Sequence, residues 1–152
     1  MNKLDLIEII ASHNPDYVAT AYEGSEKGYN EKLYFESYFL SLGTNVIDCD
    51  VCSLSAFSVA IDLLKPNFGV FFSEKENYIF NKNGYVIFDL KRSNFEKKVK
   101  KWNEIGNIDI FNANNYYFKK VNEIIKSYIK EKINKHVVVD TNFGSLSKIA
   151  PY

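Results

Sequence analysis

The chain has 152 residues, in which 19 Lys and Arg are balanced by 19 Asp and Glu, so its formal net charge is zero. This balance argues against a dedicated nucleic-acid or membrane-surface protein, since both usually carry a coherent basic excess. Hydrophobic residues make up 46% and charged residues 25%, which is ordinary for a globular chain with an apolar core. The length fits one domain, or one domain with part of a second.

Apolar periodicity in the first third of the chain predicts alternating helices and strands. We expect a helix over residues 4–11 and a strand over residues 17–22. Residues 23–30 hold two glycines and small polar residues, which predicts a turn that can approach a ligand. The next helix is expected to lay an apolar stripe on a sheet and to end before Gly43. That stripe consists of Leu33, Phe35, Tyr38, Phe39 and Leu42.

The stretch 42–84 is the expected centre of the fold. A β-branched run predicts a strand over residues 45–49, and the apolar spacing from about Leu54 to Leu64 predicts a helix that Pro66 stops. Residues 68–72 then form a second buried strand. A loop at the carboxyl end of such a strand, here at Ser73, is where α/β folds place ligand chemistry.

The remaining elements are predicted from turn residues and helical spacing. Residues 81–84 read as the turn of a hairpin whose strands cover 78–80 and 85–88. We expect a helix over about 94–105, with its lysines solvated and Phe95, Val99 and Trp102 directed inward.

A longer helix is expected from residue 117 to about 133, followed by a buried strand in 136–144. Such a strand normally opens a new α/β unit. We therefore expect a first domain over residues 1–134 and the opening strand of a truncated second domain over 135–152.

Membrane spans and secretion signals do not appear in the sequence pattern, because no stretch reaches about 20 apolar residues and the first residues lack a signal-peptide pattern. We expect a cytoplasmic protein that binds neither membrane nor nucleic acid. Cys49 and Cys52 form a C-x-x-C between a strand and a helix, which is the position of a thioredoxin-type redox pair. Since the helical spacing starts only at about Leu54, two buried, inert thiols are the favoured interpretation.

Taken in order, the sequence motifs resemble those of the first domain of the α-D-phosphohexomutases, the family of phosphoglucomutases and phosphomannomutases. The chain reads YVATAYEGS, LGTNVIDCDVC, SLSAFSVAI, NFGVFFS and YIFNKNGYVIF, and closes with KSYIKEKI and VVVDTNFGSLSKIAP. This order matches that family's from about Tyr17 to Tyr152. The resemblance implies a three-layer α/β/α fold with a mixed sheet, and a parent activity that moves phosphate between C1 and C6 of a hexose.

The resemblance also assigns candidate site residues. Ser73 corresponds to the serine that carries the phosphoryl group in the family, although the loop around it is several residues shorter here. Lys75 is the expected phosphate contact, while Glu23 and Ser25 stand where the family has the aspartate and arginine of a D-x-R loop. Glu74 and Glu76 replace the family's His-Asn-Pro region, and neighbouring carboxylates repel a phosphate.

Ser12 is a second candidate serine, because residues 11–15 spell A-S-H-N-P, like the phosphoserine loop of the family. These residues come before the first strand, whereas the family's loop follows the third. A turn that ends the first helix is therefore the favoured interpretation.

Two functions remain open at this stage. The first is the N-terminal domain of a divergent phosphohexomutase, inactive as this chain. A complete family member would bind a hexose phosphate and Mg²⁺, but the metal-binding and sugar-phosphate-binding domains are not in this sequence, so no cofactor is expected here. The alternative is a non-catalytic binding or assembly module, with residues 137–139 pairing with a partner's sheet edge.

Overall fold

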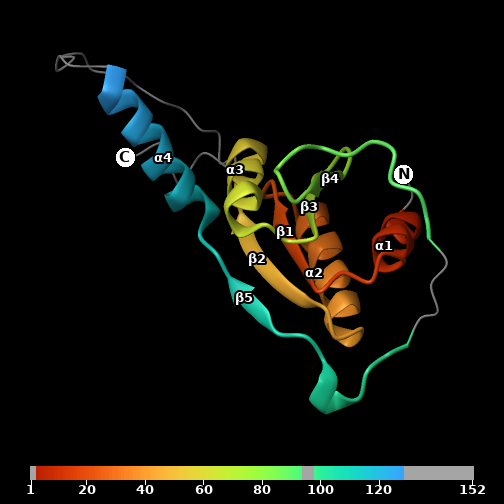
Figure 1. Ribbon diagram of the computed structural model, residues 1–152. Helices are drawn as coiled ribbons and strands as arrows, with labels where there is room; N and C mark the ends of the chain where they lie inside the picture. The colour runs from red at the N-terminus through yellow and green to blue at the C-terminus, as the bar shows by residue number, and fades with distance from the viewer. Residues whose placement is uncertain (1–2, 94–97, 129–152) are drawn as a thin grey trace.

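The computed structural model describes residues 3–93 and 98–128, which form a three-layer α/β/α fold around one mixed five-stranded sheet (Figure 1). The fold class predicted from the sequence is therefore confirmed. The elements in chain order are α1 (Lys3–Ala11), β1 (Tyr17–Tyr22), α2 (Glu26–Ser41), β2 (Asn45–Val51), α3 (Leu54–Leu64), β3 (Phe68–Phe72), β4 (Tyr78–Asn81), the 3₁₀ turn η1 (Trp102–Glu104), β5 (Ile108–Ile110) and α4 (Ala113–Tyr128).

The first strand occupies the centre of the sheet, whose order is β4-β3-β1-β2-β5. β1 pairs in parallel with β2 on one side and with β3 on the other, so that Ala19 lies opposite both Ile47 and Gly69. β5 extends the sheet in parallel beyond β2, while β4 closes the other edge antiparallel to β3. The chain therefore leaves the centre first in one direction and then, after crossing over β1, in the other.

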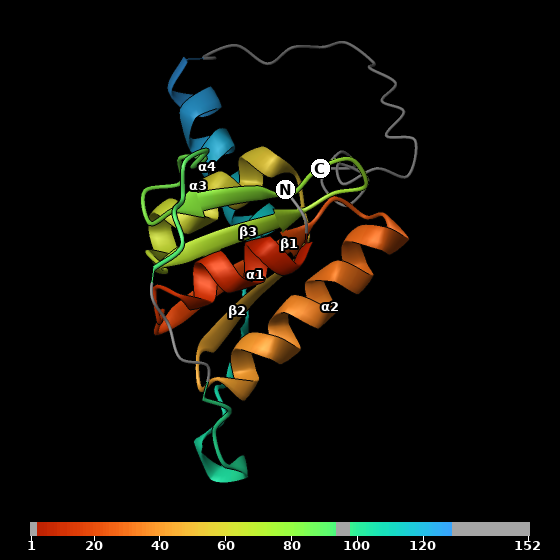
Figure 2. The same cartoon turned by 90° about the vertical axis from the view of Figure 1, so that its right-hand side faces the viewer.

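Apolar side chains cover both faces of this sheet, because successive residues of each strand point to opposite sides. One core packs α1 and α2 on alternate strand residues that include Val18, Val46 and Val70. The second core packs α3 and the start of α4 on the other face, against Ala19, Ala21 and their neighbours. Figure 2 shows α1 and α2 in front of the sheet and α3 behind it. The far end of α4 extends away from this body (Figure 1).

Serine caps fix where the two crossover helices begin. The hydroxyl of Ser25 accepts a hydrogen bond from the Gly28 N–H at 3.1 Å, and that of Ser53 accepts from the Ala56 N–H at 3.2 Å. A serine at this position satisfies one of the backbone donors that the first turn leaves unpaired. Both helices therefore start directly after the carboxyl ends of their strands, and the turn predicted over residues 23–30 is shorter than expected.

The prediction for residues 94–105 is wrong in the part that the structure describes. Residues 98–101 are not helical, only η1 makes a single 3₁₀ turn, and Trp102 and Val99 are 86% and 66% exposed instead of buried. The backbone instead bonds to the end of α2, with the Lys100 N–H donating to the Ser41 carbonyl at 2.9 Å. These tertiary hydrogen bonds hold the segment in an extended path that leads into β5.

β5 was not predicted, because three residues give almost no periodic signal. The hairpin turn at 81–84 is confirmed, with Gly84 at a φ of 77°, but its second arm forms only a single bridge from Val86 to Phe80. In the expected stripe of α2, Phe35 and Phe39 are buried whereas Leu33 is 40% exposed.

The predictions for Phe95, for the end of the last helix and for the strand in 136–144 lie outside the described residues, as does the second domain expected over 135–152. Within residues 3–93 and 98–128, none of the helices is both long enough and apolar enough to cross a membrane.

Candidate ligand-binding site

A pocket of about 680 Å³ opens at the carboxyl ends of β1 and β3. The connection after β1 leads through α2 to β2 on one side, and the connection after β3 leads to β4 on the other side, so the two connections diverge at this point. Open α/β sheets commonly bind ligands in the crevice that such a divergence creates. The lining residues are Glu23, Gly24, Ser25, Leu54, Phe71, Ser73, Glu74, Lys75, Glu76 and Tyr78.

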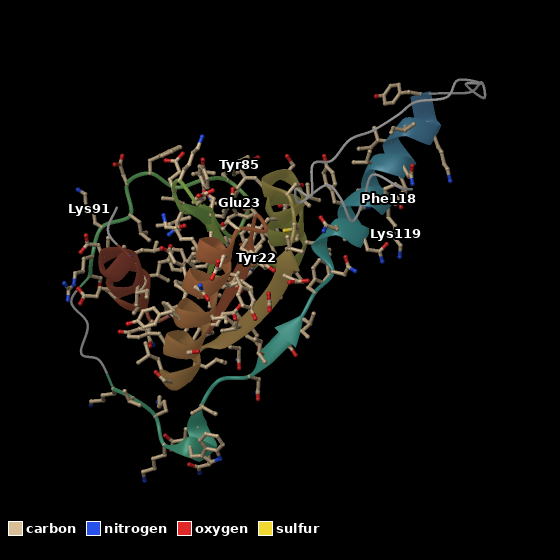
Figure 3. All side chains as sticks on the ribbon, turned by 180° about the vertical axis from the view of Figure 1, so that it is seen from behind. Tyr22, Glu23, Tyr85, Lys91, Phe118 and Lys119 are labelled. Carbon is tan, nitrogen blue, oxygen red and sulfur yellow. The ribbon has the colours of Figure 1, made fainter. Side chains whose placement is uncertain are left out.

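The loop after β1 forms one wall of the pocket. Tyr22 and Glu23, labelled in Figure 3, mark the carboxyl end of this strand. Gly24 has a φ of 109°, a conformation that glycine adopts without a steric penalty. At Gly28, a Cβ would lie 3.1 Å from the Phe72 carbonyl oxygen, so the absence of a side chain lets the first turn of α2 approach the end of β3.

The opposite wall is the tight turn between β3 and β4. The Ser73 hydroxyl donates to the Glu76 carbonyl at 2.5 Å and accepts from the Glu76 N–H at 3.1 Å. The Ser73 N–H donates to the Asn77 side-chain oxygen at 3.3 Å, and the Asn77 amide in turn donates to Glu31 of α2 at 2.8 Å. The side chains of Ser73 and Asn77 therefore hold the turn in one shape against α2.

Direct hydrogen bonds join the two walls. The Glu74 N–H donates to Oε1 of Glu23, and the Lys27 ammonium group donates to the Glu74 carbonyl at 2.6 Å. The Glu23 N–H also donates to the Phe72 carbonyl at 3.1 Å. Loops that lie about 50 residues apart in the sequence are thus held together as one site.

Apolar and aromatic side chains form the rest of the lining, with Leu54 from α3, Phe71 from β3 and Tyr78 from β4. The Tyr78 hydroxyl donates to Oε1 of Glu76 at 2.6 Å. This hydrogen bond raises the pKa of the Tyr78 phenol, and the charges of Glu76 and Glu23 act in the same direction. The pocket therefore combines an apolar surface with carboxylates whose positions are fixed by hydrogen bonds.

Four of the residues singled out from the sequence meet in this pocket. Glu23 and Ser25 lie on one wall, and Ser73 and Lys75 lie on the other. Leu54, Phe71 and Tyr78 were missed as lining residues, because an apolar side chain near a strand end reads as core until the sheet order is known.

Ser12 lies elsewhere. It ends α1 with its hydroxyl donating to the Ile9 carbonyl at 2.7 Å and accepting from the Ser93 N–H at 2.9 Å. The neighbouring His13 ring contacts Phe68, the first residue of β3, so this turn is at the amino-terminal side of the strands. Its contacts match a turn that ends a helix.

Cys49 and Cys52 are free and buried, as the favoured interpretation expected. Burial raises the pKa of the Cys49 thiol far above its usual range, and the neighbouring Cys52 and Asp48 add to this effect. A thiol in such surroundings stays protonated and unreactive at neutral pH.

A second group of charged side chains lies on the α2 face of the sheet, and the sequence reasoning missed its helical members. The Lys32 ammonium group is 2.9 Å from Glu36 and 2.7 Å from Asp48, and Thr20 donates to Glu36 at 2.5 Å. Lys32 is only 2% exposed. The signal was the helical spacing of Lys32 and Glu36 with Phe35 and Phe39, which puts all four on one buried face.

Burial raises the pKa of the Glu36 carboxyl, and the charge of Asp48 acts in the same direction, while the hydrogen bonds from Thr20 and Lys32 only partly offset this rise. For Lys32, burial by itself lowers the pKa, but the hydrogen bonds to Asp48 and Glu36 outweigh it and raise the pKa above its usual 10.5. The charged form of Lys32 is therefore the form that this network, defined by Thr20, Lys32, Glu36 and Asp48, holds in place.

Comparisons with known proteins assign no family to the chain: no protein-family model matches it, and no curated protein matches it significantly. In the part of the chain that the structure describes, no three His, Cys, Asp or Glu side chains are grouped so as to hold a metal ion.

Proposed function

We propose that the chain is a carbohydrate-binding domain, the first domain of a divergent phosphohexomutase-like protein, and that it does not transfer a phosphoryl group by itself. One observation carries the proposal. Glu23 and Ser25 on one loop and Ser73 and Lys75 on another are the positions that the family resemblance assigns to the substrate site, and they line a single pocket. The hydrogen bond from the Glu74 N–H to the Glu23 carboxylate joins these loops directly.

The lining of the pocket suits a sugar. Carboxylates such as Glu23 and Glu76 accept hydrogen bonds from hydroxyl groups, while Ser25 and Lys75 can donate to ring and hydroxyl oxygens. The apolar face of a sugar ring packs well on aromatic and aliphatic side chains, which Tyr78 and Leu54 supply. The same cavity therefore offers both kinds of contact.

The surroundings of Ser73 argue against phosphoryl transfer by this chain. A serine nucleophile needs an adjacent base and an accessible oxygen. The Ser73 side chain is buried, and the hydrogen bonds of its hydroxyl go to the backbone of Glu76. Ser73 is therefore proposed to shape the turn.

Binding is tested by titrating ¹⁵N-labelled protein with glucose and with mannose. We expect the backbone amide signals of Gly24, Ser25 and Lys75 to shift in a saturable manner, while that of Lys120 on the distant α4 stays unchanged. A Glu23→Gln variant should weaken the binding several-fold, with Glu104→Gln as the matched control at the other end of the sheet. Unchanged amide signals with both sugars would sink the proposal.

Catalysis is tested separately by a coupled phosphoglucomutase assay and by mass spectrometry after incubation with a hexose bisphosphate. The expected result is no turnover and no phosphorylation of Ser73 or Ser12. Turnover by this chain would overturn the proposal that it does not transfer a phosphoryl group by itself.

An assembly module is the second candidate, and β5 favours it, because β5 is an edge strand of the sheet among residues 3–93 and 98–128. Ile108 and Ile110 of this edge strand are 48% and 84% exposed, and exposed edges pair readily with other strands. Light scattering of wild type and of Ile110→Lys tests this: a dimer that the substitution dissociates supports assembly, and a monomer in both cases rejects it. For either candidate we keep the cytoplasm as the expected location, with which the free thiols agree.

A further inference from the structure

We infer that the pocket at the ends of β1 and β3 selects uncharged sugars and excludes their phosphate esters. The inference rests on the proposed function, because it takes a carbohydrate as the occupant of this pocket. It departs from what the phosphohexomutase resemblance implies, and it follows from the charges that the structure brings together.

The charged side chains that line the pocket are three carboxylates, on Glu23, Glu74 and Glu76, and one ammonium group, on Lys75. Glutamate and lysine are both charged at neutral pH, so the lining carries two excess negative charges. The next two residues of α2, Glu26 and Lys27, add one charge of each sign and leave this excess unchanged.

Two of the carboxylates are fixed where they meet a ligand. Glu23 accepts the N–H of Glu74 from the opposite wall, and Glu76 accepts the hydroxyl of Tyr78 at 2.6 Å. Neither carboxylate has an ion pair among those found in residues 3–93 and 98–128. A phosphate in the cavity would face these unpaired carboxylates with Lys75 as the single ammonium group of the lining, whereas a sugar hydroxyl would find two hydrogen-bond acceptors.

The start of α2 does not reverse this selectivity. A helix N-terminus attracts anions through its free N–H groups. Here the Ser25 hydroxyl already accepts a hydrogen bond from the Gly28 N–H at 3.1 Å, and Glu26 places a carboxylate in the first turn. The helix is therefore capped by the chain's own groups.

The test compares glucose with glucose 1-phosphate by ¹⁵N chemical-shift titration at low ionic strength. We expect glucose to bind at least about tenfold more tightly than glucose 1-phosphate, since each carboxylate a few ångströms from the phosphate weakens binding several-fold. Added salt should narrow this ratio, because it screens exposed charges.

A double variant, Glu74→Gln with Glu76→Gln, removes the excess charge but keeps an acceptor for Tyr78. We expect it to raise the affinity for glucose 1-phosphate relative to the affinity for glucose about tenfold, and the ratio of the two affinities is the quantity measured. Glu104→Gln, a single exposed carboxylate on η1, is the control and should change neither affinity.

The outcomes separate this inference from the proposed function. If glucose 1-phosphate binds as tightly as glucose to the wild type, the selectivity is wrong and the carbohydrate site stands. If the double variant leaves the ratio unchanged, the charges do not set the selectivity and the inference fails. If neither ligand shifts the signals of Gly24 and Lys75, the proposed function fails and the inference falls with it.

Discussion

Two groups of charged side chains lie near the carboxyl ends of the parallel strands, and they are built in opposite ways. In the network on the α2 face, Lys32 lies within 2.9 Å of both of its carboxylate partners and is almost fully buried. At the pocket on the other side of β1, Glu74, Lys75 and Glu76 are exposed and the carboxylates outnumber the ammonium group.

The paired charges of the buried network stabilise the fold, whereas the exposed charges at the pocket are available for ligand binding. Buried charges are tolerated only when paired and hydrogen-bonded, and removing one partner leaves another without compensation. Exposed like charges cost little stability, because water screens them. We therefore expect substitutions in the network to change stability and substitutions at the pocket to change ligand binding.

The largest effect is expected from Lys32→Met. Loss of the ammonium group leaves Glu36 and Asp48 as two buried or half-buried carboxylates without a cation, which should lower the free energy of unfolding by about 3–5 kcal/mol. Chemical denaturation measures it. Lys120→Met, whose ion pair with Glu123 is exposed, is the control and should change stability by about 0.5 kcal/mol or less. Equal effects of the two variants would contradict the structural role of Lys32.

Alkaline pH should weaken the same interaction without a mutation. The pKa of Lys32 is raised by its partners Glu36 on α2 and Asp48 on β2, so its contribution is complete below 10.5 and is lost as the pH rises through the folded-state value. The Tyr22 ring, 6.0 Å from the Lys32 ammonium group, is the facing group on β1.

The stability difference between wild type and Lys32→Met isolates the contribution of Lys32 together with that of the groups that sense its charge, Tyr22 and Cys49, because the alkaline titrations of remote groups are common to both proteins. We expect the difference to shrink above about pH 10.5 in urea unfolding. A difference that stays constant up to the alkaline limit of folding would show that the Lys32 charge is not what stabilises the network.

A smaller loss is expected from Thr20→Val. The Thr20 hydroxyl donates to Glu36 in the core, and a hydrogen bond to a charged group contributes about 1.5–3 kcal/mol. Valine keeps the shape of the side chain and removes the donor. Thr44→Val is the matched control for a neutral acceptor, since Thr44 donates to the Pro15 carbonyl at 2.9 Å, and it should cost about 1 kcal/mol. A larger loss of stability in Thr44→Val than in Thr20→Val would refute the idea that the hydrogen bond to the charged Glu36 contributes more than one to a neutral carbonyl.

The smallest effect is expected at the pocket. Ser73→Ala removes the two hydrogen bonds that its hydroxyl makes with Glu76, which should cost about 1 kcal/mol in thermal or chemical unfolding. The double Glu74→Gln and Glu76→Gln variant should stay within about 0.5 kcal/mol of wild type. A larger destabilisation by the double variant than by Thr20→Val would remove the contrast between the two regions.

Local signals were sufficient for most elements of the central sheet. The alternating run at 17–22, the apolar run at 68–72 and the helical spacing before Pro66 each predicted the observed element, because propensity, periodicity and packing agree there. The helix predicted for residues 98–105 is wrong because local spacing and tertiary contacts disagree there. Their helical spacing competes with hydrogen bonds to the end of α2, and those tertiary bonds decide the conformation.

The candidate site was predictable in its parts and not in its assembly. The resemblance pointed to Glu23, Ser25, Ser73 and Lys75 one at a time, whereas Tyr78 gave no separate signal and the helical spacing of Lys32 and Glu36 was not recognised as that of a buried pair. A lysine on a helix reads as solvated until a strand supplies its partner, here Asp48. Sequence spacing cannot state which carboxylates face each other across a sheet.

By itself, the sequence determined an alternating α/β pattern and the loops after β1 and β3, because local propensity acts over a few residues. Only the tertiary structure decided that β1 is central, that the two loops share one pocket, and that Lys32 is buried between two carboxylates. Strand order depends on contacts between residues far apart in the chain, and such contacts leave no period in the sequence.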